Sequence, residues 1–253
     1  MQDSRLNASA EEAAGERWDD RTRTLLGDEA LARLAAARVL VVGTGGVGGY
    51  AAEMLCRSGI GHLTLVDADC VAPSNLNRQL IALRSTLGEP KTLLFAERFR
   101  DINPDAEVTA VQEFLTPEST DALLDRGFDY VVDCIDTVAP KVALLAACLR
   151  RRIPVISSMG AGGRTDPTKA GYADIWATRE DGLARAVRQR LRKLGLRRSL
   201  LTVSSTETPH ANSVIEINGR NKRSSFGTLA TIPSIFGILL ANHVILRLSN
   251  PPS

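Results

Sequence analysis

The stretch that decides the fold is RVLVVGTGGVGG, residues 38–49, in which the apolar run Arg38–Val42 ends in a cluster of glycines. A short apolar run closed by glycine is typical of a buried parallel strand. Glycines at this point let the backbone turn tightly and approach a phosphate group, and the helix that follows offers free N–H groups at its N-terminus. The loop therefore predicts a nucleotide site. The glycines expected to contact the nucleotide are Gly43, Gly45, Gly46 and Gly48.

The rest of the first half alternates between strand and helix patterns. Strands are expected at 63–67, 107–112, 129–133 and 153–158, and helices at 47–57, 91–102, 141–151 and from Thr116 onward. Such alternation with short connections predicts a Rossmann-like α/β fold, a mostly parallel sheet with helices on both faces. After Gly160 the pattern loosens into a C-terminal extension. It holds the basic segment Ala184–Arg198, a strand at 200–204 and a last helix within 232–248.

Length and composition favour one globular unit. The chain has 253 residues, of which 44% are apolar, enough to bury a substantial core. Residues 1–16 lack the apolar segment of a secretory signal and are expected to be a disordered lead-in to a single domain, 17–253, that includes the extension 159–253. The apolar stretch Ile232–Leu248 is short for a membrane span and contains a proline, so a buried helix is expected. We therefore expect a cytoplasmic protein without stable membrane insertion.

Charged residues after the second strand bear on the choice of nucleotide. Asp67 ends that strand about 20 residues after the glycine loop, where a carboxylate accepts hydrogen bonds from ribose hydroxyls. This feature suits NAD and ATP equally. The segments SNLNRQ (74–79) and GEPK (88–91) then supply Arg78 and Lys91. Fixed cations stabilise charge on an α-phosphate and a departing pyrophosphate, so they favour ATP and nucleotidyl transfer over hydride transfer. The alternative is an ordinary solvated pair of surface cations.

The segment VDCIDT, residues 132–137, follows the fourth strand. Ligands of open α/β sheets bind at the carboxyl ends of the strands, so Asp136 is expected to hold the magnesium ion that accompanies a nucleotide triphosphate. The alternative is that Asp133 or Asp136 caps the next helix.

These motifs together resemble the HesA/MoeB/ThiF adenylating superfamily. The shared order is GxGGVG, DxD, SNLNRQ, GxPK and DxxD, and it covers about residues 17 to 159. The resemblance implies ATP and Mg²⁺ as cofactors, and an enzyme that activates a carboxylate as an acyl-adenylate. It also implies a homodimer in which Arg21 of one subunit reaches the ATP of the other. The residues that it assigns to ribose, phosphates and reacting centre, with their motif neighbours, are Asp67, Asp69, Asn75, Arg78, Gln79, Lys91 and Asp136.

Features of the second half of the chain indicate which branch of this superfamily it resembles. No CxxC pair for structural zinc occurs, and no cysteine follows Cys148 to serve as a thioester nucleophile. The segments MGAGGRTDPT (159–168) and VSSTE (203–207) resemble the tRNA threonylcarbamoyladenosine dehydratases. That resemblance implies ATP-dependent dehydration, through cyclisation, of threonylcarbamoyladenosine in tRNA. A sulfur-relay protein is a further candidate partner.

The basic segment Ala184–Arg198 fits an RNA substrate, because it contains no acidic residue and its apolar residues recur at helical spacing. Its cations are Arg185, Arg188, Arg190, Arg192, Lys193, Arg197 and Arg198, and a second cluster comprises Arg220, Lys222 and Arg223. A solvated amphipathic helix is the alternative. The rival functions are adenylation of the C-terminus of a ubiquitin-like or sulfur-carrier protein, a nucleotide-binding scaffold without turnover and, last, NAD-dependent oxidoreduction.

Overall fold

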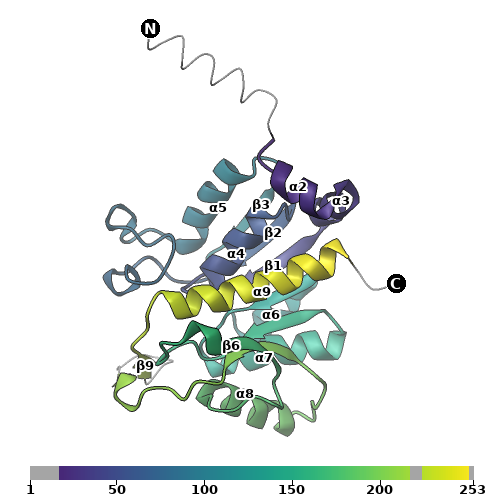
Figure 1. The fold of residues 1–253 in the computed structure, drawn as a ribbon. Helices are drawn as coiled ribbons and strands as arrows, with labels where there is room; N and C mark the ends of the chain where they lie inside the picture. Colours follow the sequence, from purple (N-terminus) through teal and green to yellow (C-terminus); the bar gives the residue numbers. More distant parts are fainter. Residues whose placement is uncertain (1–16, 217–223, 251–253) are drawn as a thin grey trace.

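A computed structural model describes residues 17–216 and 224–250, so the expected lead-in and the cluster Arg220, Lys222 and Arg223 lie outside the described residues. The centre of the molecule is a seven-stranded sheet in the order β3-β2-β1-β4-β5-β7-β6 (Figure 1). Its strands are β1 (Arg38–Val42), β2 (His62–Val66), β3 (Glu107–Val111), β4 (Tyr130–Asp133), β5 (Val155–Ser158), β6 (Ala170–Asp174) and β7 (Leu201–Ser205). All neighbouring pairs are parallel except β6 and β7, and the predicted Rossmann-like fold class is confirmed.

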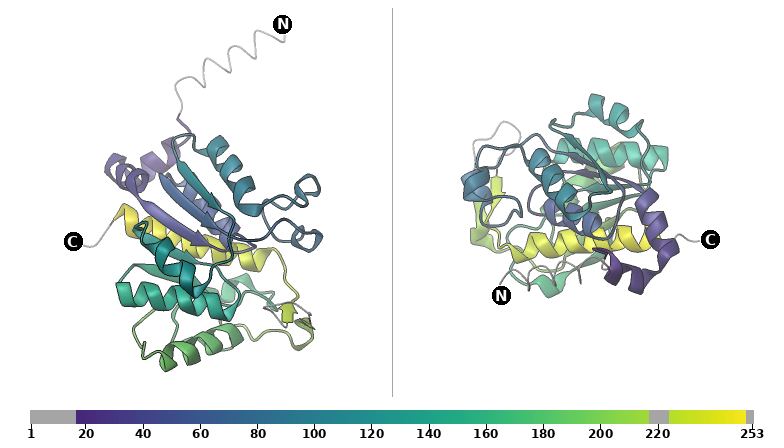
Figure 2. Two further views of the ribbon diagram at one scale, coloured as in Figure 1. Left: turned by 180° about the vertical axis from the view of Figure 1, so that it is seen from behind. Right: turned by 90° about the horizontal axis from the view of Figure 1, so that it is seen from above.

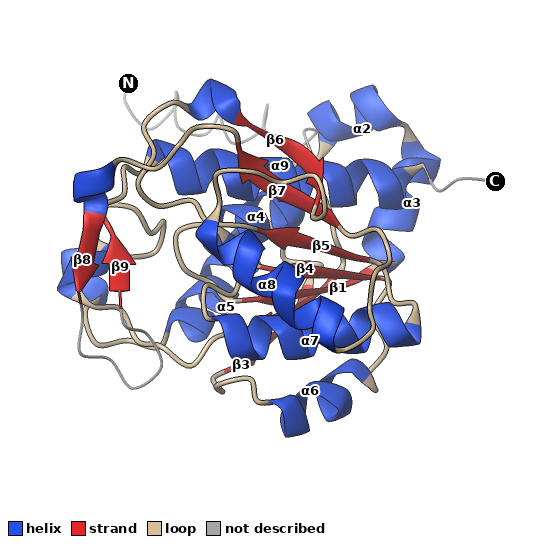
Figure 3. Ribbon diagram, turned by 90° about the horizontal axis from the view of Figure 1, so that it is seen from below, coloured by secondary structure: helices blue, strands red, loops and turns tan. Residues whose placement is uncertain are grey.

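Helices cover both faces of this sheet, as Figures 2 and 3 show from behind, above and below. The longer helices are α3 (Asp28–Ala36), α4 (Gly48–Arg57), α5 (Lys91–Ile102), α6 (Pro117–Leu124), α7 (Val138–Arg151), α8 (Gly182–Lys193) and α9 (Thr231–Ser249). One layer contains α4, α5 and α9, and the other contains α6 and α7, with α8 packed on the outside of α7. The short helix α2 (Asp20–Leu26) precedes α3, and a hairpin of β8 (Val214–Glu216) and β9 (Ser224–Phe226) projects from the sheet.

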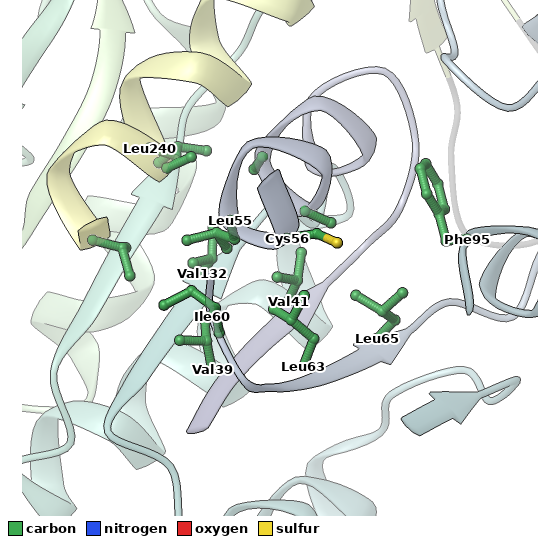
Figure 4. Close-up of a cluster of buried hydrophobic side chains, with 14 of the residues drawn as sticks. Val39, Val41, Leu55, Cys56, Ile60, Leu63, Leu65, Phe95, Val132 and Leu240 are labelled. Carbon is green, nitrogen blue, oxygen red and sulfur yellow. The ribbon is translucent and has the colours of Figure 1, made fainter. Parts of the chain in front are cut away.

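The strands at the centre of the sheet are apolar on both sides because both faces are covered. Val39 and Val41 of β1 point into the cluster beneath α4 and α9, together with Leu55 and Leu240 (Figure 4). The alternate residues of the same strand belong to the opposite cluster, under α6 and α7. The predicted strand at Arg38–Val42 is therefore confirmed. It is a continuous apolar run and does not alternate between apolar and polar residues, because both of its sides are buried.

The order of the strands reverses direction between β1 and β4. From β1 the chain moves outward through β2 and β3, and it then returns to place β4 on the other side of β1. The carboxyl ends of β1 and β4 are consequently neighbours, with Val42 opposite Asp133. Such a reversal leaves a crevice beyond the strand ends, where ligands bind in open α/β sheets.

The last helix packs against the helix that follows the glycine loop. Phe236, Leu240 and Val244 on the inner face of α9 are fully buried. A Cβ built on Gly237 would lie 2.3 Å from the backbone oxygen of Val47, so only glycine permits this approach. Among the described helices, α9 is long and apolar enough to cross a membrane by length and composition. The inner face of α9 is buried as predicted, whereas Ile238 and Leu246 on its outer side are exposed.

Two elements of the extension differ from expectation. The basic helix begins at Gly182 and ends at Lys193, because Gly195 adopts a positive φ of 72° that is typical of a helix terminus. The predicted continuation to Arg198 is therefore wrong. The antiparallel edge strand β6 was not predicted, since its residues AGYAD are all half-buried or exposed and show no apolar alternation.

The contact between α9 and α4 generates a stability prediction. We expect Gly237→Ala to lower the free energy of unfolding by about 1–3 kcal/mol, because the added methyl group overlaps the Val47 oxygen and forces the helices apart. Urea unfolding followed by circular dichroism measures the change. Gly182→Ala is the matched control, since nothing lies within 4 Å of its added Cβ. Equal stability of both variants would show that the two helices separate without cost.

Candidate active site

The turn from β1 into α4 requires glycine at two positions. Gly43 has a φ of 87°, and a Cβ on it would lie 2.8 Å from the backbone oxygen of Cys134. A Cβ on Gly48 would lie 1.7 Å from the Gly43 oxygen. The loop is thus closed on itself and pressed against the end of β4. The N-terminus of α4 consequently points into the crevice between β1 and β4, as an anion site requires.

Asp67 holds the glycine loop in place. Its Oδ2 accepts hydrogen bonds from the backbone N of Thr44 at 2.7 Å and from Thr44 Oγ1 at 3.0 Å. Its Oδ1 accepts from the backbone N of Asp69 at 2.9 Å. A carboxylate has about four acceptor sites, so capacity remains for a ribose hydroxyl. The structure thus adds a loop-fixing role to the ribose contact that the sequence predicts.

The SNLNRQ segment brings two amides to the crevice. Asn75 is buried, and its Oδ1 accepts from the backbone N of Ala72 at 3.0 Å, which fixes the turn. Gln79 is also buried, and its Nε2 lies 3.5 Å from the position of a Cβ on Gly45. The Oε1 of Gln79 has no hydrogen-bond partner within the described part of the chain. A buried polar atom beside the glycine loop that lacks a partner fits a site completed by a polar ligand.

Arg78 and Lys91, the two cations of the predicted site, are each held by contacts within the protein. A Cβ on Gly46 would lie 3.4 Å from Cγ of Arg78, so this side chain sits over the glycine loop. The guanidinium donates to the backbone oxygen of Ser74 at 2.8 Å. Lys91 is 4% exposed, and its Nζ lies 3.0 Å from Oδ2 of the exposed Asp69. The structure therefore packs the stem of Arg78 against the glycine loop and pairs the Lys91 ammonium with another predicted site residue.

The end of β4 contains a buried ion pair that sequence reasoning missed. Nζ of Lys141 lies 2.7 Å from Oδ2 of Asp133, and both side chains are fully buried. Ser157 Oγ donates to the same oxygen at 2.6 Å, and Lys141 also donates to the Ile135 oxygen at 2.8 Å. Asp133 therefore does not cap α7, which corrects that alternative. The available signal was a lysine within an otherwise apolar helical run, KVALLAACL.

Asp136 follows this ion pair on the loop that leads into α7. Its side chain is exposed at the carboxyl edge of the sheet, and its Oδ1 accepts from Thr137 Oγ1 at 3.3 Å. Over residues 17–216 and 224–250, no group of three or more His, Cys, Asp or Glu side chains could hold a metal ion. Mg²⁺ needs only one or two carboxylates when phosphates and water complete its shell, so Asp136 fits a nucleotide-borne ion.

Arg21 is not brought to the site of its own chain. It is exposed on α2, next to α3, whose Arg33 donates to the Ser249 oxygen at the C-terminal end of α9. Pro233, near the other end of α9, lies 3.3 Å from a Cβ on Gly46. At 1.5 Å per residue these two ends are about 24 Å apart. The helix pair that carries Arg21 therefore contacts the end of α9 that is remote from the glycine loop.

The segments 159–168 and 203–207 contribute to the loop that follows β5. Arg164 is buried, and it donates to the backbone oxygens of Glu207 at 3.2 Å and Glu180 at 2.8 Å. Burial lowers the pKa of this guanidinium, and the nearby Asp181 carboxylate, 3.6 Å away, opposes that effect. Asp181 also accepts from the Gly160 N–H at 2.9 Å and caps α8. These contacts fix the conformation of the segment that follows the carboxyl end of β5.

The basic segment is only partly available to a ligand. Arg188 is half-buried, and its NH1 donates to the backbone oxygens of Ile175 and Thr178, each at 3.1 Å, which reduces its availability to a phosphate. The Arg192 guanidinium stacks on the Trp176 ring, 5.3 Å from its centroid. The remaining cations are exposed, and they are Arg185, Arg190, Lys193, Arg197 and Arg198.

Cys56, Cys134 and Cys148 show no sign of nucleophilic activation. All four cysteines are free thiols. Burial raises the pKa of Cys56 and of Cys148 to about 12, and it raises that of Cys134, beside the glycine loop, further still. Thiolates are the reactive form, so these three side chains are unsuited to thioester chemistry.

Comparisons with known proteins agree with this geometry. The ThiF family model matches residues 20–253. The chain is 42% identical over 238 residues to the tRNA threonylcarbamoyladenosine dehydratase of Bacillus subtilis, covering 90% of this chain and 93% of that protein. The crystal structure of the Escherichia coli tRNA N6-threonylcarbamoyladenosine dehydratase in complex with ATP superposes with a TM-score of 0.84 at 38% identity, covering 90% of this chain and 92% of the other.

A more distant relative represents the rival branch. The sulfur carrier protein ThiS adenylyltransferase of Escherichia coli is 36% identical over 156 residues, which cover 59% of this chain and 62% of that protein. The family match and the dehydratase matches both extend through the C-terminal extension. On this evidence the chain belongs to the ThiF family.

Proposed function

We propose that the protein catalyses the ATP-dependent dehydration of threonylcarbamoyladenosine in tRNA. The threonyl carboxylate attacks the α-phosphate of ATP, the bond to pyrophosphate breaks, and an acyl-adenylate forms. A nucleophilic atom of the same modification then attacks the activated carbonyl, which closes a ring and releases AMP. The oxygen lost from the carboxylate leaves on AMP, so the modification loses one water in total.

The observation that carries this proposal is the packing of the Arg78 side chain against the glycine loop, with its Cγ 3.4 Å from a Cβ built on Gly46. The α-phosphate gains charge as the carboxylate attacks, and a guanidinium can contact its oxygens at two points. Lys91 adds a second cation at the same edge once phosphate competes with Asp69 for the ammonium. Charges that are already in position need little reorganisation during the reaction, which is how such sites lower a barrier.

Magnesium belongs to the proposal through Asp136. When bound, the ion would offset negative charge on the phosphates, and Asp136, whose side chain is exposed after β4, would hold it. The loop that carries Asp136 starts at the buried pair of Asp133 and Lys141, so its first residues are fixed. Together with the glycine loop, Asp136 would align the two substrates and supply part of the rate by proximity.

A homodimer is proposed because Arg21 lies far from the site of its own chain and is exposed. In a dimer this arginine would enter the partner's crevice and complete its phosphate contacts. A cytoplasmic location without membrane insertion is proposed as well, and the packing of α9 against α4 supports it. A sulfur-relay partner stays a prediction.

The proposed activity is tested on nucleosides. tRNA that carries threonylcarbamoyladenosine, incubated with the protein, ATP and Mg²⁺, should yield a nucleoside lighter by one water, detected by mass spectrometry, with one pyrophosphate released per product. Unmodified tRNA should release none, because it lacks the carboxylate. Pyrophosphate release with a glycine-tailed carrier protein, and none with modified tRNA, would instead identify a carrier-protein activator.

Replacing Asp136 tests its role at the metal. Asp136→Ala should lower turnover at least tenfold, about 1.4 kcal/mol or more in barrier, because the ion loses its protein ligand. The thermal midpoint should stay unchanged, since the side chain is exposed. Asp101→Ala, which removes an exposed carboxylate from α5, is the control and should keep full activity. Activity within about threefold of the parent would show that Asp136 is not needed for the ion.

Mixing two inactive variants tests the shared site. Arg21→Ala and Asp136→Ala should each lose activity, and mixing them under exchange conditions should restore about a quarter of the parental rate. Half of the molecules would then be mixed dimers, each with one intact site. Two outcomes count against the shared site, namely no recovery in mixed dimers that ultracentrifugation confirms, or full activity of Arg21→Ala.

A further inference from the structure

A cleft opens at the amino ends of β5 and β7, at the opposite edge of the sheet from the glycine loop. The two strands pair only through Ser157 with Thr202 and Ser158 with Val203, so they separate toward their amino ends. The space between them holds about 480 Å³, the size of a site for a small ligand or one nucleotide. Its walls are the turn from α7 into β5 and the loop from α8 into β7.

The lining combines an apolar floor with a cationic rim. Leu149, Ile153 and Val155 contribute apolar surface, and the rim carries Arg152 and Arg198. Arg152 is exposed at a positive φ of 58°, as the residue that ends α7. Arg198 is held toward the cleft by a hydrogen bond from its NH1 to the Leu149 oxygen at 3.1 Å. Such a surface suits a base on the floor and phosphate at the arginines.

Further cations surround this cleft, and the nearest carboxylate given by the contacts of its lining residues is that of Asp174, which accepts from Ser199 and Leu200. Arg150 precedes Arg152 on α7, while Lys193 and Arg197 leave α8 beside Arg198, and all three are exposed. In the described part of the chain none of these three forms an ion pair, and neither does Arg152. The one arginine here that does is Arg151, at 2.5 Å from Asp125. The exposed cations around the rim therefore outnumber the Asp174 carboxylate beside it.

We propose that this cleft binds a nucleotide of the tRNA substrate outside the modified position, with the base on the apolar floor and its phosphates on Arg152 and Arg198. The inference rests on the proposed function and extends it to a second contact with the RNA. A polynucleotide is the fitting occupant, because the cations extend beyond the cleft along both α7 and α8 and would neutralise several phosphates in a row. An ATP molecule in the crevice at the other edge would not reach them.

Removing charge from the rim tests the proposal. A triple variant, Arg152→Gly with Lys193→Ala and Arg197→Ala, should bind tRNA at least tenfold more weakly, and the slope of log affinity against log salt should fall by about 2–3. Glycine at 152 keeps the left-handed backbone without strain. KM for tRNA should rise, while kcat at saturating tRNA and the ATP-induced shift in thermal midpoint should stay within twofold of the parent, since no rim residue lies at the crevice.

A matched control separates this cleft from general charge loss. Arg152→Gly alone should lower the salt slope by about 1, whereas Arg100→Ala, an exposed arginine of α5 on the other side of the sheet, should leave it unchanged. Crosslinking with tRNA that contains 4-thiouridine should mark the peptides 148–155 and 198–201. Parental affinity and slope in the triple variant, or crosslinks confined to other peptides, would overturn the cleft proposal. The dehydration assay on the parent protein is separate, so failure of the proposed function is recognised independently.

Discussion

The buried pair of Asp133 and Lys141 is the interaction on which the site depends. Taking two charges out of water costs several kcal/mol per ion unless each has close, well-directed partners. Here the carboxylate also accepts from Ser157, and the ammonium also donates to the Ile135 oxygen, so β4, β5 and α7 are tied at one point. The loop that carries Asp136 starts from that point. It lies against the glycine turn, because a residue with a Cβ at position 43 would collide with the backbone oxygen of Cys134.

The rest of the crevice is prepared in the same way, by polar groups already bound to protein. Asp67 secures the glycine loop through Thr44, and Asp69 holds the ammonium of Lys91. Each of these charges is thus in position before a nucleotide arrives. A fixed arrangement favours the transition state because little energy is spent on reorienting dipoles during reaction.

Prediction from sequence succeeded where the signal is local. The helix from Lys91 to Ile102 and the capping of α6 by Thr116 agree with the structure at residue level, because capping and termination depend on adjacent residues. Prediction failed where a residue's surroundings come from distant segments. The sequence analysis did not identify Lys141 as a buried partner of Asp133, and it did not show that the Arg188 guanidinium bonds to backbone oxygens of another segment. The half-exposed edge strand β6 lacked a pattern altogether.

The sequence by itself determined the α/β class, the glycine turn and the order of the motifs that form the crevice, because periodicity and glycine placement act over a few residues. Only the tertiary structure decided which cations stay free. The Arg188 guanidinium donates to backbone oxygens of another segment. Arg152 and Arg197, in contrast, remain exposed around a cleft between diverging strands. Burial and hydrogen bonding depend on what packs against a side chain, and those neighbours are set by the folding of the whole chain.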